Sequence, residues 1–131
     1  MRVVGDTARL TFAVASFILN HMVQSSTLDR TFSALSDATR RDVLERLSSG
    51  PASISELARP AGISLPGMMK HVRILEQAHL VTTLKRGRTR ECRLDAEPMD
   101  DVTSWIEARR REWERRFDRL EAILEEREGE R

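Results

Sequence analysis

Apolar residues recur at helical spacing from residue 28 onward. Before a break in the pattern these residues are Leu28, Phe32 and Leu35, at intervals of four and three. After the break they are Val43, Leu44 and Leu47, at intervals of one and three. The break falls at Ser36-Asp37, and Asp37 is a favourable N-cap for a second helix over residues 38–48. Gly50-Pro51 ends this helix. We therefore expect one helix on each side of Asp37.

The next stretch predicts two short helices joined by a tight turn. Ser53 or Ser55 caps the first, over residues 56–59, and Gly62 provides the left-handed backbone that the turn requires. Ser64 caps the second, over residues 65–77, whose buried side is formed by Met68, Val72 and Leu75. Two helices with a short glycine-containing turn between them predict a helix-turn-helix.

From residue 80 the apolar period changes to two. Val81 and Thr83, and later Arg90, Cys92 and Leu94, alternate as in a β-hairpin around the basic turn Lys85-Arg86-Gly87-Arg88. A hairpin with a cationic tip directly after a helix-turn-helix is a wing. Because like charges across a two-stranded ribbon repel, we expect an anionic partner, and a DNA duplex is the obvious candidate.

Residues 98–128 are predicted to form one long helix of about 45 Å, at ~1.5 Å per residue. Its apolar stripe is Val102, Ile106, Trp113, Phe117, Leu120 and Leu124, which Trp105 and Ile123 broaden, and most other positions are arginine or glutamate. A small monomer does not need so long a helix, so the stripe predicts pairing with a second copy of the chain. The alternative is a helix folded back on its own domain. Trp105 and Trp113 belong either to the dimer core or to a ligand pocket between subunits.

The first 27 residues carry few charges, and residues 10–19, LTFAVASFIL, are almost entirely apolar. Ten residues are too few to span a bilayer as a helix, so no stable membrane association is expected. Arg2 and Arg9 before this run resemble a signal peptide. The other interpretations are a helix at a subunit interface and a translation start at Met22. We predict an extension over residues 1–27, a DNA-binding domain over 28–96 and a dimerisation helix over 97–131.

Composition narrows the classes of protein. A chain of 131 residues with 1 cysteine fits one domain without a disulfide framework or a Cys-rich zinc module. The formal net charge of +1 hides an asymmetry, since residues 54–94 hold eight bases and three acids, whereas residues 97–131 hold twelve acids and eight bases. The middle of the chain is therefore suited to an anion. The pair Arg40-Arg41 is either a solvated face or a phosphate contact.

The order and spacing of these features resemble a known family. The segments LSDATRRDVLERL, SISELARPAGISLPGMMKHVRILEQAHLV and KRGRTRECRL are similar to the ArsR-type winged-helix transcriptional repressors. The trailing segment SWIEARRREWERRFDRLEAILEE is similar to the C-terminal helix of a branch that lacks metal-site residues. The resemblance covers about residues 28–127. It implies a mainly α fold with a small β-hairpin, a winged helix-turn-helix with a long C-terminal dimerisation helix. It also implies a cytoplasmic homodimer that binds double-stranded operator DNA, usually represses its own operon and responds to an inducer.

The resemblance also implies site residues. Helix 64–77 would be the recognition helix in the major groove, and the wing 85–93 would contact the phosphate backbone. The expected DNA-binding residues are Ser64, Met69, Lys70, His71, Arg73, Lys85, Arg86, Arg88 and Arg90. The expected dimer interface is Trp105, Ile106, Trp113, Phe117, Leu120 and Leu124.

Some of these positions have a second interpretation, and three depart from the family's pattern. Met69 stands where a small hydroxyl residue is usual, His79 where a C-capping glycine is common, and Cys92 where an aromatic residue is common. His71 either reaches DNA or lies half-buried under the recognition helix. Cys92 is either a redox switch or a small hydrophobic residue.

Other function classes find less support. An enzyme is not indicated, because the sequence has no Gly-rich phosphate loop, nucleophile elbow or paired acid and base. Metal sensing is not indicated either, since residues 97–131 hold no histidine and the candidate ligands His21, His71, His79 and Cys92 are scattered. No cofactor is therefore expected. The alternative function is a protein-interaction module that acts through the C-terminal helix, with weak or non-specific DNA binding.

Overall fold

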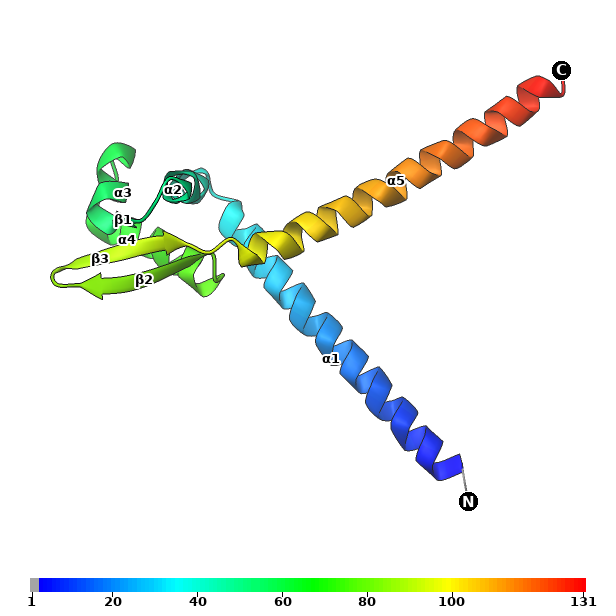
Figure 1. Ribbon diagram of the computed structural model, residues 1–131, viewed down its shortest axis with the longest axis horizontal. Helices are drawn as coiled ribbons and strands as arrows, with labels where there is room; N and C mark the ends of the chain where they lie inside the picture. The colour runs from blue at the N-terminus through cyan, green and yellow to red at the C-terminus, as the bar shows by residue number, and fades with distance from the viewer. Residues whose placement is uncertain (1–2) are drawn as a thin grey trace.

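The computed structural model describes residues 3–131 and consists of five helices and a small sheet. Its helices are α1 (Val3–Leu35), α2 (Ala38–Ser48), α3 (Ile54–Ala61), α4 (Leu65–Gln77) and α5 (Glu97–Gly129). Its strands are β1 (Ala52–Ser53), β2 (Val81–Arg86) and β3 (Thr89–Leu94). Figure 1 shows α1 and α5 as two arms that diverge from a compact body, with the β2–β3 hairpin projecting on the other side.

The N-terminal caps set the helix boundaries. Asp37 Oδ1 accepts the backbone N–H of Arg40 at 3.0 Å, so α2 begins where the sequence predicts. Ser53, rather than Ser55, caps α3, and the Ser53 N–H donates in return to Glu56 at 3.2 Å in a capping box. Because of that earlier cap, α3 is longer than the predicted 56–59. It continues through Pro60 to Ala61 before Gly62 turns with a φ of +63°.

The end of α4 is closed by a residue in left-handed backbone. His79 has a φ of +59°, and its N–H donates to the Glu76 carbonyl at 3.0 Å. The next N–H, that of Leu80, donates to the Leu75 carbonyl at 3.0 Å. This pair of bonds is a Schellman motif, which usually places glycine at the left-handed position. The family pattern of a glycine here thus corresponds to a real backbone requirement, which this chain meets with a strained histidine.

The sheet has three antiparallel strands in the order β1–β3–β2. Only the hairpin was predicted, because the two-residue β1 is too short to show an alternation. Arg86 pairs with Thr89, so Gly87 and Arg88 form a two-residue turn in which Gly87 adopts a φ of +62°. Since β1 and β2 flank β3, the strand that carries Cys92 is the central one.

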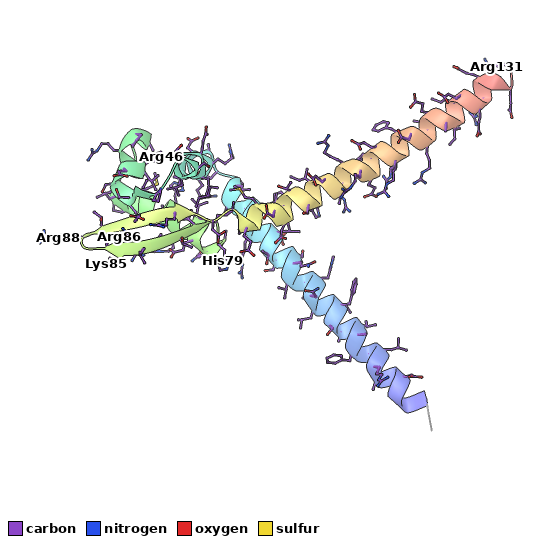
Figure 2. The ribbon with its side chains drawn as sticks, in the orientation of Figure 1. Arg46, His79, Lys85, Arg86, Arg88 and Arg131 are labelled. Carbon is purple, nitrogen blue, oxygen red and sulfur yellow. The ribbon has the colours of Figure 1, made fainter. Side chains whose placement is uncertain are left out.

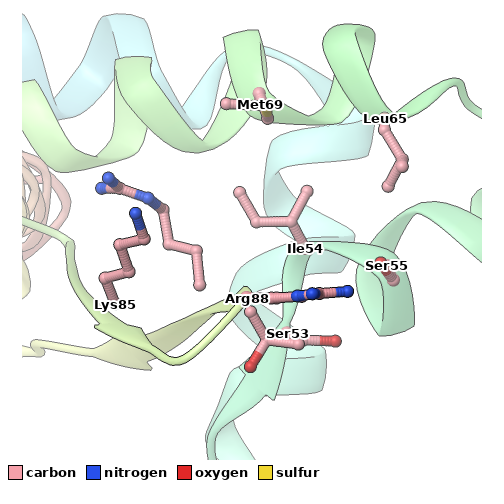
Figure 3. A pocket seen from close by; sticks show the side chains of 9 residues that line it. Ser53, Ile54, Ser55, Leu65, Met69, Lys85 and Arg88 are labelled. Carbon is pink, nitrogen blue, oxygen red and sulfur yellow. The ribbon is translucent and has the colours of Figure 1, made fainter.

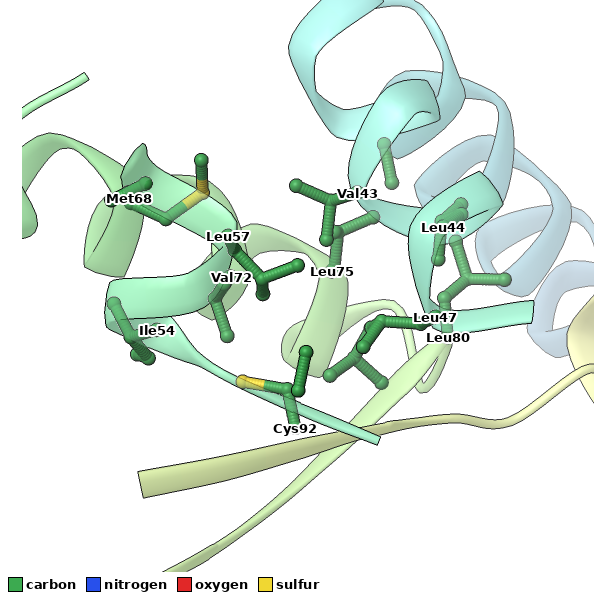
Figure 4. Packing of buried hydrophobic residues seen from close by; sticks show 14 of the residues in the cluster. Val43, Leu44, Leu47, Ile54, Leu57, Met68, Val72, Leu75, Leu80 and Cys92 are labelled. Atoms are coloured by element: carbon green, nitrogen blue, oxygen red, sulfur yellow. The ribbon is translucent and has the colours of Figure 1, made fainter. Parts of the chain in front are cut away.

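One hydrophobic core joins α2, α3 and α4 to the sheet (Figure 4). Met68, Val72 and Leu75 of α4 are fully or almost fully buried in it, as their spacing predicts. They meet side chains from the other elements of the body: Val43, Leu44, Leu47, Leu57, Leu80, Val81 and Cys92. This core fixes α4 against the hairpin and leaves Met69, Lys70 and Arg73 of that helix exposed.

Helices α1 and α5 contact each other next to this core and then diverge from it as the two arms. Helix α1 runs unbroken across residue 27, and every side chain from Gly5 to Ser26 is exposed. Helix α5 extends outward and does not fold back on its own domain (Figure 1), so that alternative is wrong. Among the described residues no helix combines the length and the hydropathy needed to cross a membrane.

Candidate nucleic-acid interface

Helix α4 and the hairpin lie side by side and present basic side chains on the same part of the body. Lys70 and Arg73 are exposed on α4, on the side away from Met68, Val72 and Leu75. Lys85, Arg86 and Arg88 gather at the tip of the hairpin, at the end of the molecule opposite the arms (Figure 2). An anion of extended shape could therefore meet the helix and the hairpin together.

The first turns of α4 border a groove against the hairpin. We define the α4–wing groove, of about 290 Å³, by the residues that line it: Ser53, Ile54, Ser55, Leu65, Met69, Lys85, Arg88, Thr89 and Arg90. Figure 3 shows Leu65 and Met69 on α4 above Ile54, with the wing cations across the groove. Leu65 was not among the predicted site residues. Its position in the first turn of a recognition helix, where base contacts concentrate, was the available signal.

Ser64 is engaged in capping. Its Oγ accepts the backbone N–H of Gly67 at 3.2 Å and thereby fixes the start of α4. A Cβ at Gly67 would lie 3.1 Å from that same oxygen and 3.0 Å from Ile63 Cγ2, so the glycine keeps the cap open. A contact between Ser64 and DNA stays a prediction and would have to use the hydroxyl proton.

The wing compensates part of its own charge. The Glu91 carboxylate accepts hydrogen bonds from the Arg93 guanidinium at 2.9 Å, and it lies 3.7 Å from Arg86 Nε. The expectation that like charges on the ribbon require an external anion is therefore too strong for Arg86 and Arg93. Within residues 5–131, Lys85 and Arg88 form no such ion pair, and these two cations remain available to a partner.

Arg90 is tied to α4. It lies directly across the ladder from Lys85, a repulsive arrangement, and its Nη1 donates to Thr83 Oγ1 at 2.9 Å. Thr83 in turn donates to Glu76 Oε1 at 3.0 Å. This chain of hydrogen bonds links β3 through β2 to α4 and orients the wing relative to the helix.

His71 faces the body. Its side chain is 25% exposed, and its buried Nδ1, which has no hydrogen-bond partner among the described residues, lies 3.8 Å from Asp37 Oδ1. The hydrogen bond from the Arg40 backbone, with the charges of Arg40 and His71, outweighs burial and lowers the pKa of Asp37 below its usual value. His71 thus occupies the half-buried position, and a contact with DNA stays a prediction.

The arginine pair of α2 bonds to the end of α1, although Arg41 remains exposed, and a phosphate contact stays a prediction. Arg40 Nε donates to the Ala34 carbonyl at 2.7 Å, and Arg41 Nη1 donates to the Leu35 carbonyl at 2.9 Å. These are the last carbonyls of α1, which a helix leaves without internal partners. The two arginines therefore close the C-terminus of α1 and fix the corner between α1 and α2.

Cys92 is a buried thiol. It has no exposed surface, and its burial in the core, together with the charge of Glu76, raises its pKa to about 11. A protonated, inaccessible thiol reacts slowly, which favours the small hydrophobic residue over the redox switch. Among residues 5–131 no group of three or more His, Cys, Asp or Glu side chains could hold a metal ion.

The residues predicted for the dimer interface form an exposed stripe on α5. Trp113, Phe117, Leu120 and Leu124 lie beyond the crossing with α1, and each is more than half exposed. Trp105 and Ile106 lie at the base of the stripe and are less exposed, and Phe32 of α1 packs against the ring of Trp105. Monomeric proteins rarely expose a continuous apolar surface of this kind, so the stripe is a candidate interaction site.

The fold and the basic wing define a winged helix-turn-helix protein, and comparisons with known proteins agree. A family profile described as a helix-turn-helix domain matches residues 35–83. The chain is 42% identical over 67 residues to the HTH-type transcriptional regulator Rv2034 of Mycobacterium tuberculosis, over 51% of this chain and 63% of that protein. It is 29% identical to the transcriptional repressor SdpR of Bacillus subtilis, over 60% of this chain and 88% of that protein.

A solved structure extends the likeness to the fold. The crystal structure of the ArsR family transcriptional regulator RHA00566 superposes with a TM-score of 0.66 at 44% identity, covering 69% of this chain and 93% of that chain. The chain belongs to the ArsR family of helix-turn-helix transcriptional regulators. It spans less than two thirds of the length of the mycobacterial relative. These relatives are transcriptional regulators by name.

Proposed function

We propose that this chain is a sequence-specific DNA-binding repressor that acts as a homodimer. The observation that carries the proposal is that α4, which exposes Lys70 and Arg73, packs against the hairpin whose tip carries Lys85 and Arg88. Among the described residues these two wing cations form no ion pair. Helix α4 would enter the major groove, where its side chains read base edges, and the wing would hold the flanking phosphates. The name of the Bacillus subtilis relative, a transcriptional repressor, supports repression over activation.

The apolar stripe on α5 supports the homodimer. Burial of each large apolar side chain contributes about 1.5–3 kcal/mol, and a two-fold interface buries each of them twice. A dimer would present two copies of α4 to successive major grooves about 34 Å apart, which predicts a pseudo-palindromic operator. The cytoplasm is the compartment in which such a regulator would meet its operator.

A fluorescence-anisotropy titration tests this function. The full chain is titrated into the labelled duplex from upstream of its own gene and into a shuffled duplex of equal composition, at several salt concentrations. We expect the upstream duplex to bind at least about a thousandfold more tightly, with affinity that falls steeply as salt rises. The control is the Lys85→Ala/Arg88→Ala double variant, in which log K against log salt should become shallower by about 2 for each wing.

Weak and equal binding of both duplexes would contradict specific DNA recognition at this site. If the chain nevertheless remains a dimer, the result favours the alternative, in which α5 mediates an interaction with another protein and DNA binding is non-specific. The exposed stripe is the observation that favours that second candidate.

A further inference from the structure

The DNA-facing part of α4 carries two apolar side chains that the fold does not use. Leu65 is 51% exposed and Met69 is 43% exposed, whereas the buried stripe of the same helix is complete without them. They are four residues apart, so they lie one above the other on one side of the helix, with about 5–6 Å between their Cβ atoms. Both belong to its first two turns.

The first turns of a recognition helix are the part that meets base edges. In the major groove an apolar side chain has one apolar feature to contact, the C5-methyl group of thymine. Serine or asparagine at these positions could instead bond to a base or a phosphate. Leucine has no polar atom, and the thioether of methionine is only a weak acceptor, so neither serves that purpose.

We propose that Met69, supported by Leu65, reads thymine methyl groups and makes an A·T pair a requirement of each half-site. The inference rests on the proposed function, because it assumes that α4 enters the major groove. It assigns a base to the position at which this chain departs from the family's small hydroxyl residue.

The surroundings of the two side chains agree with this role. Both line the α4–wing groove, whose other side carries Lys85, Arg88 and Arg90. A DNA strand in that groove would bring its phosphates to these cations while the bases of the same strand face α4. The cations would supply affinity for any sequence, and the two apolar side chains would supply the preference.

The experiment begins with the full chain and a pool of random duplexes. Sequences enriched by binding are aligned, and every thymine of the consensus half-site is replaced in turn by deoxyuridine, which lacks only the C5-methyl group. We expect at least one position at which the wild-type chain binds the uracil duplex about three- to fivefold more weakly, the effect of one buried methyl group. At that position Met69→Ser should bind both duplexes equally.

Two matched variants isolate the effect of Met69. Leu84→Ser removes a comparably exposed apolar side chain from β2, 54% exposed, and should keep the wild-type ratio between the thymine and uracil duplexes. Lys70→Ala should weaken binding to both duplexes by the same factor. Comparing ratios rather than affinities cancels any effect of uracil on the shape of the duplex. Thermal melting of each variant checks that the fold is retained.

The outcomes separate the two proposals. An enriched consensus without any effect of uracil overturns the reading of methyl groups but leaves the repressor function standing. An effect of uracil that persists in both Met69→Ser and Leu65→Ser overturns the assignment to these residues. If no sequence is enriched, the proposed function fails, and the reading of thymine fails with it.

Discussion

The ring of Phe32 in α1 meets that of Trp105 in α5 edge to face, with their centroids 5.8 Å apart and their planes at 78°. The guanidinium of Arg109 lies 5.6 Å from the centroid of the same indole. Such aromatic pairs contribute about 0.5–1.5 kcal/mol beyond the area that they bury. Figure 1 shows the two helices diverging as arms outside the body, and this contact is one that joins α1 to α5.

Removal of the N-terminal arm should leave the folded body intact. A chain that starts at Met22 lacks residues 1–21, and the described side chains of that segment, from Gly5 on, are all exposed. We expect its thermal midpoint to lie within about 2 °C of that of the full chain at low protein concentration. A larger loss would show that the arm stabilises the body. A difference that grows with protein concentration would show that the arm joins two copies.

Substitution in the middle of the α5 stripe should separate the proposed dimer. Phe117 is 63% exposed, and Phe117→Ser removes its ring from both subunits of a two-fold interface. We expect the dissociation constant to rise at least about a hundredfold. Sedimentation velocity over a range of concentrations measures it, with Arg119→Ser on the other side of α5 as the control. A single-chain mass for the wild type at all concentrations would refute the interface.

The wing and the recognition helix should contribute differently to DNA binding. Arg88→Ala should weaken binding to all duplexes alike. The slope of log K against log salt, which is negative, should become shallower by about 1 for each wing. Arg73→Ala should also relax the preference for the specific duplex, by about 1–3 kcal/mol. Arg46→Ala, an exposed arginine of α2 away from the hairpin, is the control in the same anisotropy titration. Unchanged affinity in both variants would exclude these contacts.

The left-handed histidine should be a correctable source of strain. His79→Gly removes the penalty of a φ of +59° and should stabilise the protein by about 1 kcal/mol, measured by urea unfolding. His79→Ala is the matched control, because alanine meets the same penalty, and it should change the stability little. Gly62→Ala, at a φ of +63°, should destabilise by a similar amount. A loss of stability in His79→Gly would mean that the imidazole makes a stabilising contact.

Cys92 should make the protein less stable at high pH. Its folded pKa is raised from 9.0 to about 11, so its contribution is present in full below pH 9 and is lost as the pH rises toward 11. Urea unfolding at pH 8, 9 and 10 should therefore show a steeper decline for the wild type than for Cys92→Ala. Iodoacetamide should label the native thiol slowly and the unfolded thiol quickly. Parallel declines would contradict the shift in pKa.

The sequence was most informative where a single residue determines the conformation of the backbone around it. Asp37 and Ser64 as caps, Gly62 as a left-handed turn, the hairpin turn at Gly87 and the apolar stripe of α4 all lie where the sequence predicts them. Caps and turns are decided by neighbours within four residues, so they can be predicted without the fold. The family resemblance, which rests on the same local features, is confirmed by the comparisons.

Tertiary structure decided which of these residues remain free. Arg40 and Arg41 close the end of α1, His71 turns toward Asp37, and Glu91 of β3 lies 3.7 Å from Arg86 of β2. The two-residue β1 is a strand only because β3 lies beside it. These outcomes depend on groups that are distant in the sequence or lie on another element. A charged side chain or hydrogen-bond donor that has such a partner in the fold cannot be distinguished, in the sequence, from one that has none. The local pattern determined the elements, and their packing determined the surface left for a partner.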